Sequence, residues 1–321
     1  MTLSADGPLV SICMPLYNAE AYIEETLTKL TEQTYSNIEV IIVNDHSTDR
    51  SLEIARKFES DRIKVFTNEG KGACSARNYA FRHASGEYIK FMDSDDYCTS
   101  ELIERQVEAL QSGTKKTIVF SPLKLVFPDG RLLDPERSID HDYEDAFDLQ
   151  VKIMDAGGTN VPHCYLMPRE LVETSGGWDE SIRKNQDGEY FSRVLAHADR
   201  ALSVADAFAI YRKTGTGLSK SFSHEAVSSK LQTYEKIMSL AIDRYNTDEM
   251  RTVCGRWLGR FVYANYPELK SILNNVEEIC KGYDVPLLLP ERRVLKVLRQ
   301  FLGWKKSVAL MHKVGLVKRP D

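Results

Sequence analysis

The feature that most constrains this chain is an alternation, over residues 9–127, of short apolar runs with segments whose apolar residues recur at helical spacing. The apolar runs have the length of buried strands and lie at residues 9–15, 38–45, 63–68, 87–93 and 117–127. Between the first two runs, Ile23, Leu27 and Leu30 mark one face of an amphipathic helix. Apolar strands that alternate with helices predict an α/β fold, in which helices cover both faces of a doubly wound, mostly parallel sheet.

Polar side chains follow four of the five predicted strands. They are Tyr17 and Asn18 after the first, Asn44 and Asp45 after the second, Asn68 and Lys71 after the third, and Asp93, Asp95 and Asp96 after the fourth. The carboxyl ends of parallel strands meet at one edge of the sheet, and ligands bind at that edge in doubly wound folds. The sequence therefore predicts one binding site built from these four groups.

The rest of the chain changes in character twice. Residues 128–160 are acidic and show no clear period, which indicates a surface excursion without regular structure. From about residue 222 a helical period returns and persists, for example through Leu231, Tyr234 and Met238. We therefore expect a helical appendage over residues 222–321.

Charge, cysteines and hydropathy argue against several classes of protein. The formal net charge of -5 gives no indication of nucleic-acid binding. The six cysteines form no CxxC pair, which is typical of reduced thiols in a cytoplasmic protein. No apolar run approaches the ~20 residues of a transmembrane helix, and we expect no signal peptide because no basic segment precedes an apolar one at the N-terminus.

The acidic string DSDD, at residues 93–96, permits two interpretations. If the chain is extended there, Asp93 and Asp95 point to the same side about 7 Å apart. Oxygen ligands at that spacing suit Mg²⁺ or Mn²⁺, especially when phosphate oxygens also hold the metal. The alternative is a solvated acidic turn, which the string on its own favours.

Other polar residues near the predicted edge are open to two interpretations as well. Lys71 lies between two glycines at the start of a helix, where free backbone amides either bind phosphate or simply cap a loop. Arg77 suits a carboxylate or phosphate partner, or the surface of that helix. Asp45 suits a base or ribose, or a cap on the next helix, while Tyr17 suits a stacked ring or the edge of the core.

Several blocks of the chain together carry a more specific signal. They include VSICMPLYN, VIIVNDHSTD and FMDSDD within residues 8–96, and they resume at 175–195 and 211–219. In order and spacing these blocks closely resemble family 2 glycosyltransferases of the GT-A fold. The resemblance implies a catalytic domain over 1–221, with a nucleotide-sugar half to about residue 127 and an acceptor half over 128–221.

The resemblance also implies roles for the residues at the predicted edge. Those on the nucleotide side are Pro15, Tyr17, Asn18, Asp45, Lys71, Arg77, Asp93 and Ser94. Asp93-Ser94-Asp95 is similar to the family's DxD motif, in which Asp93 faces ribose or metal-bound water and Asp95 holds Mn²⁺ or Mg²⁺ on the diphosphate. Asp96 is a weaker candidate. A divalent cation would explain why these acids are tolerated so close together.

On the acceptor side, the family carries an acid pair, often Glu-Asp, at the start of a helix, and its Asp is the catalytic base. Here the string is Gln186-Asp187, so Asp187 matches the base, and Glu189 is a second candidate. Trp178 and Asp179 correspond to the acceptor side, although Trp178 equally suits a core anchor.

Tyr211 and the segment after it resemble the mobile segment that the family carries near the diphosphate. Arg212 or Lys213 could close on the diphosphate, with the loop extending to Ser219. The His that many relatives carry there as a metal ligand is absent. His163, elsewhere in the chain, is expected to be a loop or core residue.

The basic C-terminus permits two interpretations. Residues 291–321 contain nine Lys or Arg against two acids, with Val294, Leu295, Leu298 and Leu302 along one helical face. This pattern suits an anionic membrane surface, which would place the protein near a lipid-linked acceptor. It equally suits docking on the rest of the chain, because residues 1–290 carry a formal charge of -12.

We therefore predict an inverting, metal-dependent glycosyltransferase of the hexosyltransferase type. It would use a nucleotide sugar, most readily a UDP-sugar, in polysaccharide or cell-surface glycan synthesis, in the cytoplasm or on the inner face of the membrane. The alternative is a non-catalytic nucleotide-sugar-binding or scaffold protein on the same fold. A sequence without Asp95 or Asp187 would favour this alternative, but both residues are present. A nucleotidyltransferase would need a glycine-rich basic loop after the first strand, where the chain reads PLYNAEAY.

Overall fold

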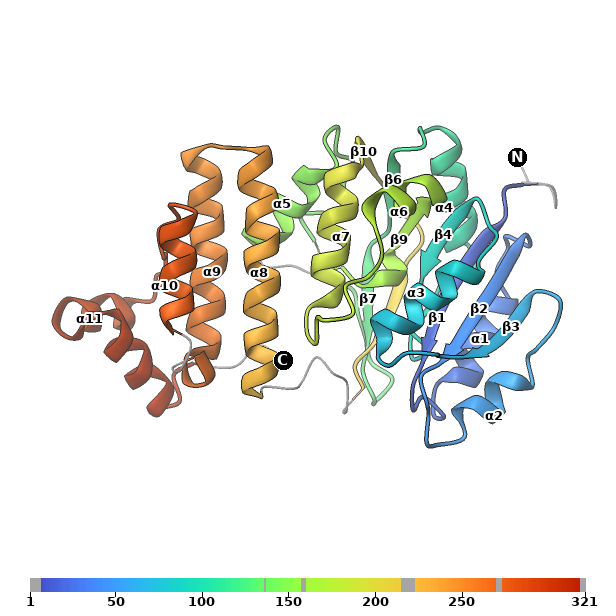
Figure 1. Ribbon diagram of the computed structural model, residues 1–321, viewed down its shortest axis with the longest axis horizontal. Coiled ribbons are helices and arrows are strands. Elements are labelled where there is room, and N and C mark those ends of the chain that lie inside the picture. Colours follow the sequence, from blue (N-terminus) through green and yellow to red (C-terminus); the bar gives the residue numbers. More distant parts are fainter. Residues whose placement is uncertain (1–6, 136, 157–159, 215–222, 270–272, 318–321) are drawn as a thin grey trace. The chain divides into compact units, whose positions relative to one another are not determined.

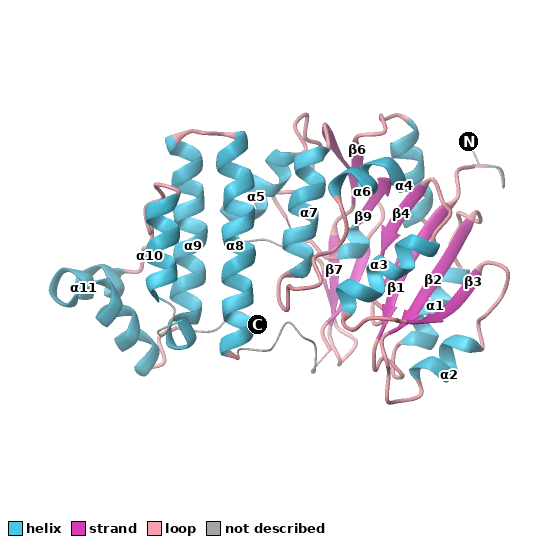
Figure 2. Cartoon of the chain, viewed as in Figure 1, coloured by secondary structure: helices cyan, strands magenta, loops and turns pink. Residues whose placement is uncertain are grey.

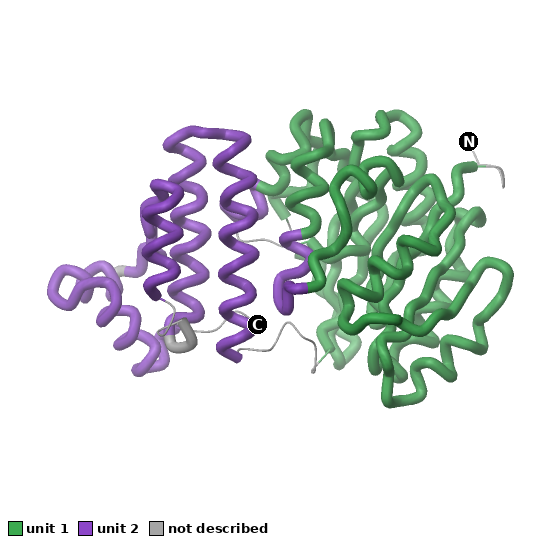
Figure 3. The backbone as a smooth tube through the Cα atoms, in the orientation of Figure 1, with its two compact units in different colours: residues 1–150, 159–180, 190–215 green, residues 151–158, 181–189, 216–321 purple. Residues whose placement is uncertain are grey.

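The computed structural model describes residues 7–135, 137–156, 160–214, 223–269 and 273–317. The chain forms two compact units, which Figure 3 colours separately. The first unit contains residues 1–150, 159–180 and 190–215, and the second contains 151–158, 181–189 and 216–321.

The first unit follows the alternation of strands and helices that the sequence predicts (Figures 1 and 2). Its opening elements are β1 (Val10–Leu16), α1 (Ile23–Thr31), β2 (Ile38–Asn44), α2 (Ser51–Arg56), β3 (Ile63–Thr67), α3 (Ala73–His83) and β4 (Tyr88–Phe91). After these come β5 (Tyr97–Cys98), α4 (Leu102–Gln111), β6 (Thr117–Phe120), β7 (Leu123–Val126) and β8 (Leu132–Leu133). The last elements of this unit are η1 (Pro162–Cys164), β9 (Tyr165–Pro168), α6 (Arg169–Ser175), β10 (Arg200–Ser203) and β11 (Ala209–Arg212).

A seven-stranded sheet, in the order β10-β6-β9-β4-β1-β2-β3, forms the centre of the first unit. β1 pairs in parallel with β2 and β4, and only β9 runs antiparallel to its neighbours. Right-handed crossovers place α1 and α2 on one face of the sheet and α3 on the other, as Figure 1 shows. Every residue of β1 and β2 is buried, which explains their largely apolar sequences, and the buried Ser11 donates to the Glu39 carboxylate at 2.6 Å. The predicted doubly wound, mostly parallel α/β fold is confirmed.

The single strand region predicted over residues 117–127 is instead two strands in two sheets. β6 belongs to the large sheet, whereas β7 belongs to a four-stranded sheet in the order β5-β11-β7-β8. The division falls at Ser121 and Pro122, where proline cannot supply a backbone donor to the ladder.

The prediction that residues 128–160 lack regular structure was wrong, because the short strand β8 lies in the first half of that range and a helix lies in the second. Helix α5 (Phe147–Ala156) lies there, and Phe147, Gln150 and Met154 are buried at helical spacing along it. Acids stand next to these positions, as at Asp148 and Asp155, and the buried Gln150 is itself polar, so the period is obscured.

The predicted helical appendage is confirmed. It contains α8 (His224–Arg244), α9 (Asp248–Leu269), α10 (Leu273–Gly282) and α11 (Arg293–Lys313). Tyr234 of α8 stacks on Trp257 of α9 with ring centroids 3.6 Å apart, at the centre of this packing. Within the described part of the chain, no helix combines the length and apolar character needed to cross a membrane.

Candidate functional site

The carboxyl ends of the central strands lie at one edge of the large sheet, as predicted. In the strand register Leu16 at the end of β1 pairs with Asn44 of β2, and Asn44 pairs with Thr67 of β3. The residues that follow these strands therefore emerge side by side. Among the predicted nucleotide-side residues, Tyr17, Asn18 and Lys71 are exposed, Asp93 is half-buried, and Pro15, Asp45, Arg77 and Ser94 are buried.

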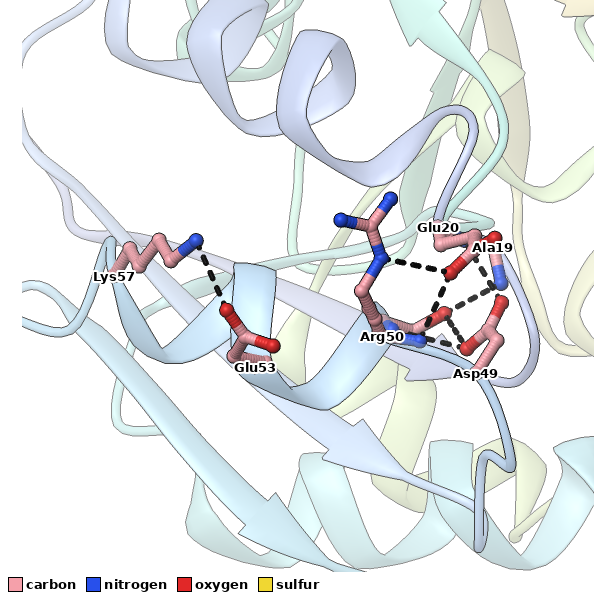
Figure 4. A network of polar contacts seen from close by, with 7 residues as sticks. Ala19, Glu20, Asp49, Arg50, Glu53 and Lys57 are labelled. Atoms are coloured by element: carbon pink, nitrogen blue, oxygen red, sulfur yellow. Dashed lines mark hydrogen bonds and ion pairs between the residues drawn. The ribbon is translucent and has the colours of Figure 1, made fainter.

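The loop after β1 is held by the residues at the start of α2, and Figure 4 shows this network. Ala19 N donates to Ser51 Oγ at 2.7 Å, and Glu20 N donates to Asp49 Oδ2 at 3.1 Å. In return, Arg50 N donates to the Glu20 carboxylate at 3.0 Å. The loop is thus fixed from both sides by backbone donors.

Tyr17 and Asn18 precede this network and occupy the exposed part of the edge. Asn18 adopts a left-handed conformation with φ of 45°, and its Oδ1 accepts from Thr48 N at 2.8 Å. The Tyr17 side chain is 60% exposed. Its ring is therefore available to stack on the ring of a bound ligand.

Asp45 connects β2 to the start of α3. Its carboxylate accepts from Gly72 N at 2.8 Å and from Asn68 Nδ2 at 2.8 Å. Gly72 has φ of +97°, a conformation that glycine adopts without strain. One interpretation of Asp45 is a cap for the next helix, α2, but its carboxylate instead accepts from the residue that precedes α3. Contact between Asp45 and a base remains a prediction. Lys71, between the two glycines, is exposed.

Arg77 lies beneath the edge and pairs with the first acid of the DSDD string. Its side chain is almost fully buried, and its Nη2 lies 2.5 Å from Asp93 Oδ1. Its guanidinium also lies over the Trp178 ring, 4.4 Å from the centroid. Because a buried guanidinium keeps its charge, it stabilises negative charge at this end of β4.

The DSDD string is a turn and not the extended segment in which Asp93 and Asp95 would share one side. β4 ends at Phe91, and Asp96 N donates to Asp93 O at 3.3 Å. The chain turns here because it leaves the large sheet and enters the small one at β5. Burial, followed by the nearby charge of Asp93, raises the pKa of Asp95 to about 6. A bound cation would relieve both effects.

Asp96 and Arg212 support the turn from behind. Asp96 is fully buried, its Oδ1 accepts from Arg212 N at 2.8 Å, and its Oδ2 lies 3.5 Å from His163 Nδ1. Burial raises the pKa of Asp96 well above its usual range and lowers the pKa of His163 to about 3. His163 is therefore neutral at pH 7 and is the core residue predicted, and Asp96, buried behind the turn, acts here as a structural residue.

The Arg212 guanidinium, predicted to close on a diphosphate, is buried against the same turn. Its Nη1 donates to Asp95 O at 2.7 Å, and its Nη2 lies 2.7 Å from Glu25 Oε2. Arg212 thus fixes the backbone of Asp95, and its contact with a diphosphate remains a prediction. Lys213 is half-buried, and the part of the predicted mobile segment at 215–219 lies outside the described residues.

Trp178, predicted on the acceptor side, is only 3% exposed. It stacks on Tyr190 with centroids 4.1 Å apart and meets the Phe91 ring edge to face. Burial of the ring favours the anchoring interpretation, and contact between Trp178 and an acceptor remains a prediction. The next residue, Asp179, is half-buried and therefore reaches the surface of this loop.

Asn78 is a residue of the site that the sequence did not single out. It follows Arg77 in α3, and its Oδ1 accepts from Trp178 N at 2.8 Å while its Nδ2 donates to Trp178 O at 2.9 Å. The same amide donates to Glu180 Oε1 at 3.0 Å. The neighbours Arg77 and Asn78 therefore hold the DSDD turn and the Trp178 loop from one turn of helix.

Replacement of Asn78 by Leu is expected to lower the free energy of unfolding by about 1–3 kcal/mol. The variant keeps the side-chain volume but leaves the Trp178 amide without its acceptor. Urea unfolding would measure the change, with Asn246→Leu, in the second unit after α8, as the surface control. A loss of stability no larger than that of the control would contradict this role for Asn78.

The candidate base Asp187 lies in the first turn of α7 (Gln186–His197) and belongs to the second unit. The segment before it is attached to α8. Arg183 N donates to Ser229 Oγ at 2.9 Å, and Asn185 Nδ2 donates to Thr233 Oγ1 at 2.8 Å. The Asp187 side chain is half-buried, whereas Glu189 is buried. Hydrogen bonds to α8 therefore fix the backbone just before Asp187.

The residues present offer carboxylate oxygens, which suit Mg²⁺ or Mn²⁺. Asp93 and Asp95 lie on one turn, and the pKa of Asp95 is raised partly by the charge of Asp93. Among the residues that the structure describes, no cluster of three or more His, Cys, Asp or Glu forms a closed metal cage. Metal binding at this edge remains a prediction.

Comparisons with known proteins agree with this arrangement. The family model described as "Glycosyl transferase family 2" matches residues 11–176. The uncharacterized glycosyltransferase EpsJ of Bacillus subtilis (strain 168) is 31% identical over 316 residues, which is 92% of this chain and 84% of that protein. The UDP-Glc:alpha-D-GlcNAc-diphosphoundecaprenol beta-1,3-glucosyltransferase WfgD of Escherichia coli is 42% identical over 106 residues, 33% of this chain and 42% of that protein. A crystal structure of S. aureus TarS 1-349 in complex with UDP-GlcNAc has the same fold, with a TM-score of 0.68 and 21% identity over 96% of this chain and 92% of that chain.

Proposed function

The chain belongs to glycosyl transferase family 2, and we propose that it transfers a sugar from a nucleoside-diphosphate sugar to an acceptor hydroxyl, with inversion at the anomeric carbon. The observation that carries the proposal is the pair of Arg77 and Asp93 beside the Asp95 carboxyl group, whose pKa is raised by burial and by the charge of Asp93. This charge arrangement lies at the same sheet edge as the exposed ring of Tyr17, where doubly wound folds bind nucleotides.

The preferred donor in this proposal is a UDP-sugar. The names of WfgD and of the TarS complex support this choice, because both contain a UDP-sugar. Tyr17 would stack on the base, with Asn18 and Asp45 beside it, and Asp93 would face the ribose. Lys71, exposed at the start of α3, would meet a phosphate of the donor.

Asp95, with Asp93, would hold Mn²⁺ or Mg²⁺ against the diphosphate. When bound, the cation would neutralise the charge that builds on the leaving nucleoside diphosphate, which lowers the barrier. The chain's own contribution is to keep the Asp95 carboxylate in place. Arg212 does this through its hydrogen bond to Asp95 O, and Asp96 orients Arg212 in turn.

Asp187 is the base of the proposed reaction. It accepts the proton of the acceptor hydroxyl while that oxygen attacks the anomeric carbon from the side opposite the leaving group. The bond between the anomeric carbon and the diphosphate oxygen breaks, and the diphosphate leaves with the electron pair. A single displacement of this kind inverts the configuration at the carbon.

The proposed acceptor is a glycan or a lipid-linked glycan, in the synthesis of polysaccharide or cell-surface glycans. The name of WfgD supports this class, since its acceptor is a sugar on diphosphoundecaprenol. We place the protein in the cytoplasm, on the inner face of the membrane. None of the six cysteines is joined in a disulfide, which is consistent with a reducing compartment.

Calorimetric titration with UDP, GDP and dTDP, each with Mn²⁺ and with EDTA, tests the donor site. UDP is expected to bind in the presence of Mn²⁺ and to lose affinity when the metal is removed. Metal-dependent binding of GDP or dTDP alone would overturn the choice of UDP but keep the site. Absence of binding by all three would instead favour a solvated acidic turn and a scaffold protein.

A further inference from the structure

Helix α11 exposes large apolar side chains on one face. Val294, Val297 and Phe301 recur at helical spacing and are all exposed, with Phe301 at 79%. Leu302, Leu310 and Leu316 are further exposed apolar residues of the same region. Of the large apolar residues that the described part of the chain exposes, most lie in or next to α11. We call Val294, Val297 and Phe301 the apolar face of α11.

α11 is interrupted at Gly303, where φ of 68° is non-helical, and the apolar face lies on the segment before this break. Both segments also bury side chains within the second unit. Leu295 and Val308 are fully buried, and Met311 is nearly so. His312 Nε2 lies 2.6 Å from Tyr263 O of α9. The Trp304 ring contacts the ring of Tyr266, also in α9, edge to face. Contacts with α9 therefore hold the segment after Gly303, while Val294, Val297 and Phe301 on the segment before it are exposed.

Charge distinguishes this region from an ordinary apolar patch. Residues 292–317 contain seven Lys or Arg and no Asp or Glu. Lys296 and Arg299 are exposed on the same stretch of helix as the apolar face. Lys305 is paired with Glu277 of α10 at 2.6 Å, so that one charge already has a partner within the unit.

We propose that α11 docks on an anionic lipid surface, with its apolar face among the acyl chains and its Lys and Arg side chains among the lipid phosphates. A helix with both features lies in the membrane interface, where apolar burial and attraction to anionic lipid add together. A symmetric contact between two copies through this face would bring the two basic stretches together, and that repulsion disfavours self-association. Docking deepens the proposed function, because it brings the protein to the surface where a lipid-linked acceptor is found.

Sedimentation of the full chain with vesicles tests the proposal. The vesicles are phosphatidylcholine alone, or phosphatidylcholine mixed with phosphatidylglycerol. The protein is expected to sediment with the mixed vesicles, to remain in the supernatant with phosphatidylcholine alone, and to be released by high salt. Equal binding to both kinds of vesicle, or binding to neither, would overturn the proposal.

Matched variants distinguish docking through α11 from non-specific apolar adsorption and from the effect of net charge. Phe301→Ser is expected to weaken binding about tenfold or more, because one large apolar side chain no longer enters the bilayer. The control Leu132→Ser removes an exposed apolar residue from the first unit and should leave binding unchanged. Lys296→Glu with Arg299→Glu should also weaken binding at least tenfold, whereas Arg56→Glu with Lys57→Glu, which changes net charge equally on α2, should not.

The same variants keep this proposal distinct from the proposed function. Calorimetric binding of UDP with Mn²⁺ should be identical in Phe301→Ser and the unchanged protein, since no residue assigned to the proposed donor site lies in α11. Loss of vesicle binding with retained UDP binding would support docking. If the unchanged protein did not bind vesicles but formed dimers, and Phe301→Ser made those dimers dissociate, a second copy of the chain would be the partner that covers this face.

Discussion

Replacement of Asp187 by Asn is expected to reduce sugar transfer by about 10²–10⁴-fold while leaving donor binding unchanged. Asn has nearly the same shape as Asp, so the first turn of α7 and its ties to α8 remain intact. It cannot accept the acceptor's proton, so the attacking oxygen stays a poor nucleophile. The loss should therefore appear in kcat and not in the affinity for the nucleotide.

The measurement is the transfer rate at saturating donor, together with calorimetric binding of UDP and Mn²⁺. Glu189→Gln is the matched control, because Glu189 lies in the same first turn and is also a carboxylate. If Glu189→Gln lost as much activity as Asp187→Asn, the base could not be assigned to either residue alone. Full activity of the Asp187→Asn variant would show that Asp187 is not the base.

The sheet and its edge could be predicted because their signals are local. β1 and β2 are buried on both faces, so their sequences are largely apolar, and the polar residues after them mark where each strand ends. Helix α5 was missed because it follows an acidic stretch and because Gln150, one of its buried positions between Phe147 and Met154, is polar. A period is visible in a sequence only when the solvent-facing positions do not carry a stronger pattern of their own.

The contacts that position the site could not be predicted, because they join residues far apart in the chain. Arg212 holds the backbone of Asp95, which lies 117 positions earlier, and Asn78 holds Trp178 across 100 positions. Nothing in the sequence around Arg212 indicates that its guanidinium faces inward rather than toward a ligand. The signal that could have found Asn78 is its position, since it lies beside Arg77 on the helix that faces the DSDD turn.

Replacement of Asp95 by Asn is expected to abolish metal-dependent donor binding and transfer, and yet to stabilise the metal-free protein. In the folded protein the pKa of Asp95 is raised to about 6 from 3.8. The unfolded chain therefore releases this proton at lower pH than the folded protein does. The free energy of unfolding consequently falls as pH rises from about 4 through 6, and above that range the ionised group costs about 2–3 kcal/mol.

Asn carries no charge at any of these pH values, so the variant should escape that cost. Urea unfolding without metal, at pH 4 and pH 8, should show equal stability of the two proteins at the lower pH and a more stable variant at the higher. Asp61→Asn, at an exposed position before β3, controls for the loss of a negative charge. With Mn²⁺ and UDP present the order should reverse, because only the unchanged protein gains stability from binding. A carboxylate that binds a ligand is expected to lower the stability of the ligand-free protein and to raise the stability of the complex. A variant that is less stable at pH 8 and still binds UDP with Mn²⁺ would instead make Asp95 a structural residue like Asp96.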